Sequence, residues 1–136
     1  MKKAVAIVLS ALFVLSFAAC GSAGGITAWA NSLSAEDISA AHIWNAEGGN
    51  HRETELSPEE IDEIVNIINS LKKNNFKWNK RLAGSTPICG LILMLEDEQY
   101  YIAESGYGKY KLEISYNDKQ WWIDCEQLND IIQNYY

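Results

Sequence analysis

The longest helical pattern lies in the middle of the chain. Its hydrophobic residues recur every three or four positions, as on one face of a helix: Ile61, Ile64, Val65, Ile68 and Leu71. Just before them, Ser57 and Glu60 have the spacing of a capping box, and Pro58 suits the first helical position. We therefore expect a helix that begins at Ser57 and ends at Asn74-Asn75.

A second helical pattern closes the chain. Its hydrophobic residues share one face: Leu128, Ile131, Ile132 and Tyr135. Asp124 precedes them and is a suitable N-cap.

Between these helices the hydrophobic period changes to two. The segment 110–116 alternates aromatic or aliphatic residues with polar ones, which is typical of a half-buried strand. The segment 90–96 (GLILMLE) is apolar on both faces, as in a central strand. Asn117-Asp118 predicts a hairpin turn. Further strands are expected at 40–46, 99–104 and 120–123, and the stretch 75–81 is also compatible with an extended chain.

Together these patterns predict an α+β fold. We expect an antiparallel β-meander of about four to five strands, with two helices packed on one of its faces. The length of 136 residues fits one domain, which we place at residues 34–136.

The N-terminus has the pattern of an export signal. Lys2 and Lys3 precede an uncharged apolar run at 4–17. This run is too short to cross a bilayer, which needs about 20 residues, and it has the length of a signal-peptide core.

Small residues follow this run. The segment 15–21, with Ala18-Ala19-Cys20-Gly21 at its end, resembles the lipobox of bacterial lipoproteins. The resemblance implies cleavage of a signal peptide at 1–19, a diacylglycerol on the Cys20 thiol, and a location at the extracytoplasmic face of the cell membrane. Two alternatives remain: secretion after cleavage at Ala28-Trp29-Ala30, and an uncleaved anchor.

Charge narrows the range of partners. The chain has 18 acidic and 11 basic residues, a net charge of −7, which argues against nucleic-acid binding. Loss of residues 1–19 would remove Lys2 and Lys3 and lower this charge further. Residues 20–33 are rich in Gly, Ala and Ser and predict a flexible tether. We therefore expect the anionic domain to stand away from anionic headgroups on this tether.

One resemblance covers most of residues 33–136. The order LSAEDI, LSPEEIDEIVNIINSLKK, LILMLEDEQYYI and KLEISYNDKQWWI, followed by a helix, resembles short uncharacterised lipoproteins of clostridia and related Gram-positive bacteria. The resemblance implies a lipid-anchored protein, but it brings no activity or functional residue with it.

Catalytic chemistry has little support in the sequence. The chain has two histidines, His42 and His51, and no G-x-S-x-G motif. A metal set of His42, Glu47, His51 and Glu53 lacks the H-E-x-x-H spacing. We expect no catalytic residue, no metal and no cofactor. A small hydrolase that uses an acid pair or these histidines is the least favoured alternative.

Two thiols remain once Cys20 is lipidated. Outside the membrane, Cys89 and Cys125 could form a disulfide. The alternative is a pair of buried free thiols.

The aromatic residues suggest a contact surface. The chain has five Trp and seven Tyr residues. Trp121 and Trp122 are adjacent on a predicted strand, so they point to opposite faces, and we expect one of them to meet solvent. Tyr107 and Tyr110 lie nearby in the sequence. These four residues are the candidate contacts of a non-catalytic binding module for a protein or peptide, or alternatively for a cell-wall glycan.

Overall fold

The computed structural model describes residues 23–135. The predicted signal peptide at 1–19 and the predicted lipidation site Cys20 lie outside this range. The helices are α2 (Ala23–Ser32), α3 (Pro58–Asn69) and α4 (Glu126–Gln133), with short 3₁₀ turns η2 (Ala35–Asp37), η3 (Glu47–Gly49) and η4 (Lys73–Asn75). The strands are β1 (Ala40–Asn45), β2 (Arg52–Glu55), β3 (Phe76–Trp78), β4 (Cys89–Met94), β5 (Gln99–Tyr107), β6 (Tyr110–Tyr116) and β7 (Lys119–Ile123).

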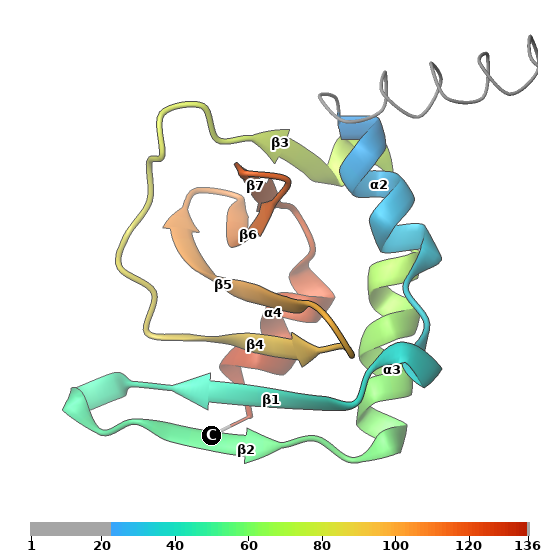
Figure 1. The fold of residues 1–136 in the computed structure, drawn as a ribbon. Helices are drawn as coiled ribbons and strands as arrows, with labels where there is room; N and C mark the ends of the chain where they lie inside the picture. The colour runs from blue at the N-terminus through green and yellow to red at the C-terminus, as the bar shows by residue number, and fades with distance from the viewer. Residues whose placement is uncertain (1–22, 136) are drawn as a thin grey trace, which may run out of the picture.

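All seven strands form one antiparallel sheet in the order β2-β1-β4-β5-β6-β7-β3 (Figure 1). The predicted α+β class is confirmed, but the sheet has more strands than the four to five expected. Strand β2 was missed because its four residues are all polar and exposed, so they leave no period-two pattern of hydrophobic residues. Strand β3 is the extended part of 75–81 and pairs with β7 at the other edge of the sheet.

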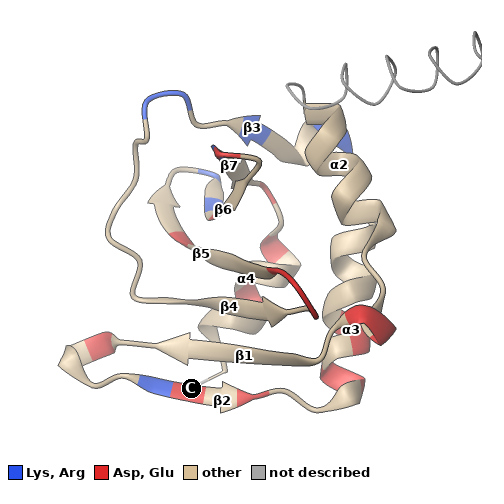
Figure 2. Cartoon of the chain, in the orientation of Figure 1, with Lys and Arg blue, Asp and Glu red and all other residues tan. Residues whose placement is uncertain are grey.

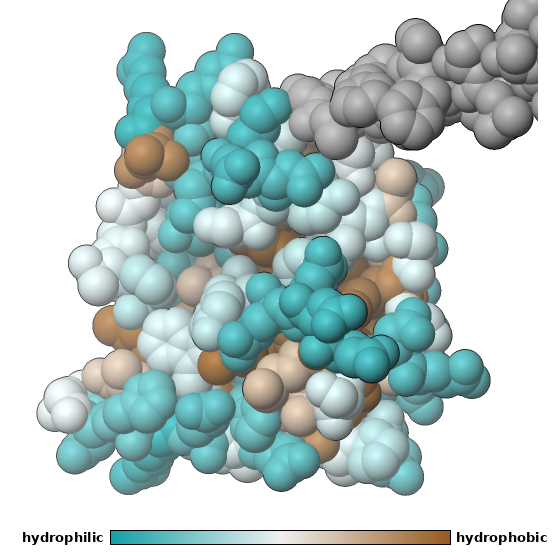
Figure 3. All heavy atoms as spheres, in the orientation of Figure 1, coloured by the Kyte–Doolittle hydropathy of each residue, from teal (hydrophilic) through white to brown (hydrophobic). Residues whose placement is uncertain are grey.

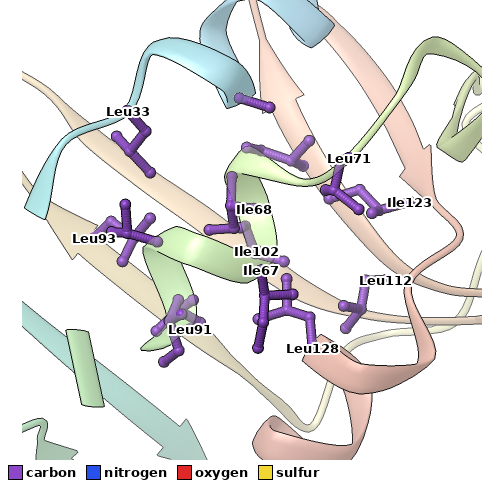
Figure 4. Packing of buried hydrophobic residues seen from close by; sticks show 14 of the residues in the cluster. Leu33, Ile67, Ile68, Leu71, Leu91, Leu93, Ile102, Leu112, Ile123 and Leu128 are labelled. Atoms are coloured by element: carbon purple, nitrogen blue, oxygen red, sulfur yellow. The ribbon is translucent and has the colours of Figure 1, made fainter. Parts of the chain in front are cut away.

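The helices share one face of the sheet, as expected. Alternate residues of the strands point to this face and join the helices in a single hydrophobic cluster, part of which Figure 4 shows. Its labelled members come from both layers: Leu33, Ile67, Ile68, Leu71, Leu91, Leu93, Ile102, Leu112, Ile123 and Leu128. The other alternate residues of the strands point to the opposite face of the sheet, which no helix in residues 23–135 covers.

Helix α2 corrects the expected tether. Residues 23–32 are helical, and Ile26, Trp29 and Ala30 are buried in the core. The Trp29 ring lies 4.9 Å from that of Tyr100 and 5.8 Å from that of Tyr116, measured between ring centroids. The small residues of this segment are thus part of a packed helix, and the folded unit includes α2 rather than beginning at residue 34.

Helix α3 begins as expected and ends earlier. The Ser57 hydroxyl accepts a hydrogen bond from the Glu60 N–H, and the Glu60 carboxylate accepts one from the Ser57 N–H at 2.7 Å, which completes the capping box. The last helical residue is Asn69, not Asn74 or Asn75. One cause is Asn31, whose side-chain amide donates to the carbonyls of Asn69 and Leu71 and so takes acceptors that another helical turn would use.

The predicted hairpin turn at Asn117-Asp118 is confirmed, whereas the predicted N-cap of the last helix is wrong. Asn117 and Asp118 both have positive φ angles, of 49° and 57°, as the predicted tight hairpin turn requires. Helix α4 has Cys125 as its N-cap instead of Asp124. The Asp124 carboxylate lies 3.0 Å from the Lys109 ammonium, and this ion pair replaces the expected cap.

Candidate functional site

The two adjacent tryptophans point to opposite faces, but neither is open to solvent. Trp121 joins the core beneath the helices and is 4% exposed. Trp122 lies on the other face and is 6% exposed. The expectation that one of them meets solvent is therefore wrong. Trp122 is covered by stacked rings, with Tyr107 at 4.3 Å and Tyr110 at 5.5 Å between centroids.

The tyrosines reach Trp122 because the β5–β6 hairpin is irregular. The register shifts between Glu104 and Tyr107, so Tyr107 pairs with Tyr110 at the end of the ladder. The buried Ser105 hydroxyl donates to the Tyr110 carbonyl across this shift. Such a bulge re-aims side chains, and here it brings the predicted contact residues Tyr107, Tyr110 and Trp122 into one stack.

A pocket of about 470 Å³ lies beside this stack. Its walls come from β3, the loop that follows β3, and the ring stack. The lining residues are Lys77, Trp78, Asn79, Lys80, Arg81, Ala83, Tyr107 and Trp122. We call it the basic–aromatic pocket. Of the four predicted contacts, Tyr107 and Trp122 line it, Tyr110 stacks behind it, and Trp121 belongs to the core.

Asn79 fixes the loop that forms one wall of the pocket. Its buried side-chain amide donates to the Ala83 carbonyl at 2.7 Å, and its side-chain oxygen accepts from the Ala83 N–H at 2.9 Å. A buried amide that is satisfied twice in this way holds a turn in one conformation. Lys80 and Arg81 are therefore held at the pocket by the fold and not by a free loop.

Two lysines of the pocket, Lys77 and Lys80, and the nearby Lys119 lie close to aromatic rings. The Lys77 ammonium is 5.6 Å from the centroid of the Tyr110 ring and 5.8 Å from that of Trp122. The ammonium groups of Lys80 and Lys119 lie 4.8 Å and 4.7 Å from the Trp78 ring centroid. Within residues 23–135, Lys77, Lys80 and Arg81 form no ion pair with a carboxylate. Their charge therefore remains available to a ligand.

The charges of the protein are divided between its two ends. Figure 2 shows lysine and arginine around β3, the loop after it and the β5–β6 turn, whereas acidic residues dominate the end formed by β1, β2 and the start of α3. Of the basic residues described, Arg52 alone lies on the β1–β2 hairpin. The protein thus has a locally basic surface although its net charge is −7.

Of the two alternatives considered for the remaining thiols, the structure has the free pair: Cys89 and Cys125 are not bonded to each other. Cys125 caps the start of α4, whereas Cys89 accepts a hydrogen bond from Gln133 in the last turn of that helix. A helix of this length spans about 12 Å, roughly twice the Cα separation that a disulfide allows. Burial raises the pKa of Cys89 to about 11 and also raises the pKa of Cys125. Both thiols therefore stay protonated and are weak nucleophiles at neutral pH.

The histidines meet at one carboxylate. His42 Nδ1 lies 3.5 Å from one oxygen of Glu53, and His51 Nε2 lies 3.6 Å from the other. Glu47, the fourth residue of the metal set considered above, instead begins the turn η3. No group of three or more His, Cys, Asp or Glu side chains in the described part of the chain is arranged to hold a metal ion.

Sequence reasoning missed the basic wall of the pocket. The signal was present as the run KWNKR at 77–81, in which three cations and a tryptophan follow one another in an acidic chain. Lys77, Trp78, Lys80 and Arg81 become a site only because the Asn79 turn and the β3–β7 pairing bring this run beside Trp122.

Comparison with known proteins supports the fold. No protein-family model and no curated protein matches the chain. A crystal structure described as that of a "putative lipoprotein" from Clostridium perfringens is similar, with a TM-score of 0.54 and 18% sequence identity. The match covers 84% of this chain and 90% of the other. The expected resemblance to a clostridial protein is thus supported at the level of the fold. Among residues 23–135, no helix has the length and apolar character needed to span a bilayer.

Proposed function

We propose that the protein is a lipid-anchored, extracytoplasmic binding module and that the basic–aromatic pocket is its recognition site. The observation that carries this proposal is the set of three cations, Lys77, Lys80 and Arg81, beside exposed rings in a protein that is otherwise acidic. Charge held in this position without a carboxylate partner attracts an anionic ligand and repels cationic ones.

The partner that fits best is a protein or peptide with an acidic segment. Tryptophan, tyrosine and arginine are the residues that most often dominate protein interfaces, because they combine large contact areas with directed hydrogen bonds. Arg81 can hold a carboxylate through two parallel hydrogen bonds. Trp78 and Tyr107 supply apolar surface next to that charge.

Crosslinking in cells tests this function. The membrane-anchored protein is crosslinked, captured and analysed by mass spectrometry, beside a Lys80→Gln/Arg81→Gln variant and an Arg52→Gln control. We expect one protein to be enriched with the native chain and the Arg52 control and lost with the double variant. Enrichment that is equal in all three, or no enriched protein at all, contradicts this function.

A carbohydrate ligand is the second candidate. The Trp78 and Tyr107 rings are both exposed and both line the pocket, and flat rings of this kind stack on sugars. Titration of the protein with cell-wall fragments should then shift the tryptophan fluorescence, and a Trp78→Ala variant should lose most of the response. An unchanged spectrum up to about millimolar sugar rejects this candidate, since weaker binding is of little use at a surface.

The anchor is proposed from the residues around Cys20. Two acyl chains hold a protein stably to a bilayer, because each buried methylene contributes about 0.8 kcal/mol. A Cys20→Ala variant should therefore leave the membrane fraction, while the native chain carries a diacylglycerol adduct that is visible in its mass. A native chain without this adduct would remove the anchor from the proposal.

We also propose that the module is not catalytic. The thiols of Cys89 and Cys125 have raised pKa values because of burial, which disfavours the reactive thiolate. The two imidazoles are turned towards Glu53 at the β2–β1 edge of the sheet, whereas the basic–aromatic pocket lies at the opposite, β7–β3 edge. Hydrolysis of an ester or glycoside panel at a rate that depends on His42 would contradict this part.

A further inference from the structure

A leucine at the tip of the loop after β3 is held out into solvent. Leu82 is 74% exposed, although it is one of the most hydrophobic residue types. Its φ angle is +49°, a left-handed conformation that is unfavourable for a leucine. The turn is closed by a hydrogen bond from the Leu82 N–H to the Asn79 carbonyl at 3.3 Å. The fold thus accepts a strained backbone and gains no burial from this side chain.

The surroundings of Leu82 are basic. Lys80 and Arg81 precede it directly, and Trp78, at 39% exposure, lies on the strand before them. Figure 3 shows a hydrophobic group that stands among hydrophilic ones at the corner of the molecule where this loop lies. An apolar tip flanked by cations is suited to the boundary between lipid headgroups and acyl chains, where both kinds of contact are available.

The position of α2 relates this tip to the membrane. The first turn of α2 and the loop after β3 lie at the same end of the molecule (Figure 1). Helix α2 is packed into the core and contacts β3, so it cannot swing freely. Ala23 follows Cys20 by three residues, and three residues span at most about 10 Å. An anchor at Cys20 would therefore bring this end close to the bilayer, at about the Debye length of 8 Å in physiological salt.

We propose that the tip formed by Lys80, Arg81 and Leu82 docks on anionic lipid headgroups of the membrane that carries the anchor. Lys80 and Arg81 contact the phosphates, and the Leu82 side chain enters the interface. The orientation rests on the anchor proposed above, whereas the charge and the exposed leucine are independent of it. Leu82 does not line the basic–aromatic pocket, so changes at this residue separate membrane docking from ligand binding.

The proposed docking differs from one expectation from the sequence. The net negative charge predicted that the domain would stand away from the membrane. Figure 2 shows most of the cations at the end of the molecule where α2 begins, and the acidic residues of β1, β2 and the start of α3 at the other end. A charge division of this kind orients a protein on an anionic surface even when the net charge is unfavourable.

The test places a polarity-sensitive dye at the tip. The full chain, purified from membranes of an expressing host, carries Leu82→Cys or, as the control at the acidic end, Asn50→Cys. Both positions are exposed, so labelling should leave the fold intact. The labelled proteins are placed in phosphatidylcholine vesicles with or without phosphatidylglycerol, and quenching by a nitroxide-labelled lipid is measured. The mass of each protein reports separately whether Cys20 is lipidated. The parent chain without an added cysteine, treated with the same dye, reports background labelling of Cys89 and Cys125.

We expect several-fold stronger quenching at residue 82 than at residue 50 in vesicles that contain phosphatidylglycerol. The addition of Lys80→Gln and Arg81→Gln should weaken the docked state by roughly fivefold per charge. A lipidated chain with equal quenching at both positions overturns the docking and leaves the anchor intact. A dye shift at residue 82 without quenching by the nitroxide-labelled lipid indicates contact with protein, such as a second copy of the chain, and also overturns it, as does quenching that is equal with and without phosphatidylglycerol. A chain without the adduct that still shows the tip signal keeps the docking and removes the anchor.

Discussion

Asn31 and Asn69 bind each other's helix ends. The Asn31 amide donates to the carbonyls of Asn69 and Leu71 at 2.8 and 2.9 Å, and the Asn69 amide donates to those of Ala30 and Leu33 at 2.7 and 3.0 Å. Four hydrogen bonds thus join the C-terminal ends of α2 and α3, where backbone carbonyls otherwise lack partners. This clasp of four hydrogen bonds makes α2 part of the domain.

Loss of the clasp should destabilise the domain. In an Asn69→Ala variant, the carbonyls of Ala30 and Leu33 lose their donor, and we expect a decrease in the free energy of unfolding of about 1–3 kcal/mol. Urea unfolding followed by tryptophan fluorescence measures this change. The matched control is Asn74→Ala, at an exposed position in η4. Equal stability of Asn69→Ala and the native chain would show that the clasp contributes nothing.

Relief of the backbone strain at Leu82 should increase the free energy of unfolding rather than decrease it. Asparagine tolerates the left-handed conformation better than leucine, so Leu82→Asn should keep or raise the unfolding free energy, by up to about 1 kcal/mol. Leu82→Ala, which keeps a Cβ without the local hydrogen bonding of asparagine, should show a smaller gain. Thermal unfolding of the three chains measures the difference. A clear loss of stability in Leu82→Asn would indicate that the leucine side chain supports the fold.

The capping box should make the stability depend on pH. The hydrogen bond from the Ser57 N–H lowers the pKa of Glu60 below its usual 4.5, and the Tyr135 hydroxyl, which donates to Glu60 at 3.0 Å, acts in the same direction. A carboxylate with a lowered folded-state pKa stabilises the fold above its unfolded pKa, and this contribution is lost as the pH falls through the folded value. Stability should therefore fall below about pH 4.5 more steeply in the native chain than in Glu60→Gln. Parallel pH profiles of the two chains would contradict the capping role.

The thiols should behave as unreactive and unpaired. Because burial raises the pKa of Cys89 to about 11, Cys89 should react with a thiol reagent at pH 8 only after unfolding. The measurement is mass spectrometry after alkylation of the folded and the denatured protein, without reductant. Two new adducts on Cys89 and Cys125 after denaturation are expected. A chain that takes up neither adduct until it is reduced would contain the disulfide that the position of α4 excludes.

Local patterns predicted the fold where burial is one-sided. The face of α3 from Ile61 to Leu71 and the alternation in β6 were legible because hydrophobic residues mark the core side of each element. Helix α2 was not predicted, because its Gly, Ala and Ser residues are also typical of a flexible linker. Only the burial of Ile26 and Trp29 distinguishes a packed helix from a linker here. Strand β2 has no buried residue, so no hydrophobic pattern marks it, although it pairs with β1 along the sheet edge.

The candidate site was predicted only in part, because it depends on contacts that local patterns do not show. The sequence shows that Trp121 and Trp122 point to opposite faces, but not that the irregular β5–β6 hairpin places Tyr107 and Tyr110 over Trp122. The pocket also needs contacts between segments far apart in sequence, such as β3 with β7. Such contacts depend on strand order, which no local pattern encodes.

Amide hydrogen exchange of residues 26–32 in the full chain tests most directly whether α2 is a rigid part of the domain, on which the orientation of the protein depends. Because Ile26, Trp29 and Ala30 are buried and Asn31 is clasped to α3, the amides of this segment should be protected to a similar degree as those of the central strand β4. Exchange at the rate of an unstructured peptide, with β4 still protected, would show that the segment is a flexible tether and would remove the fixed orientation.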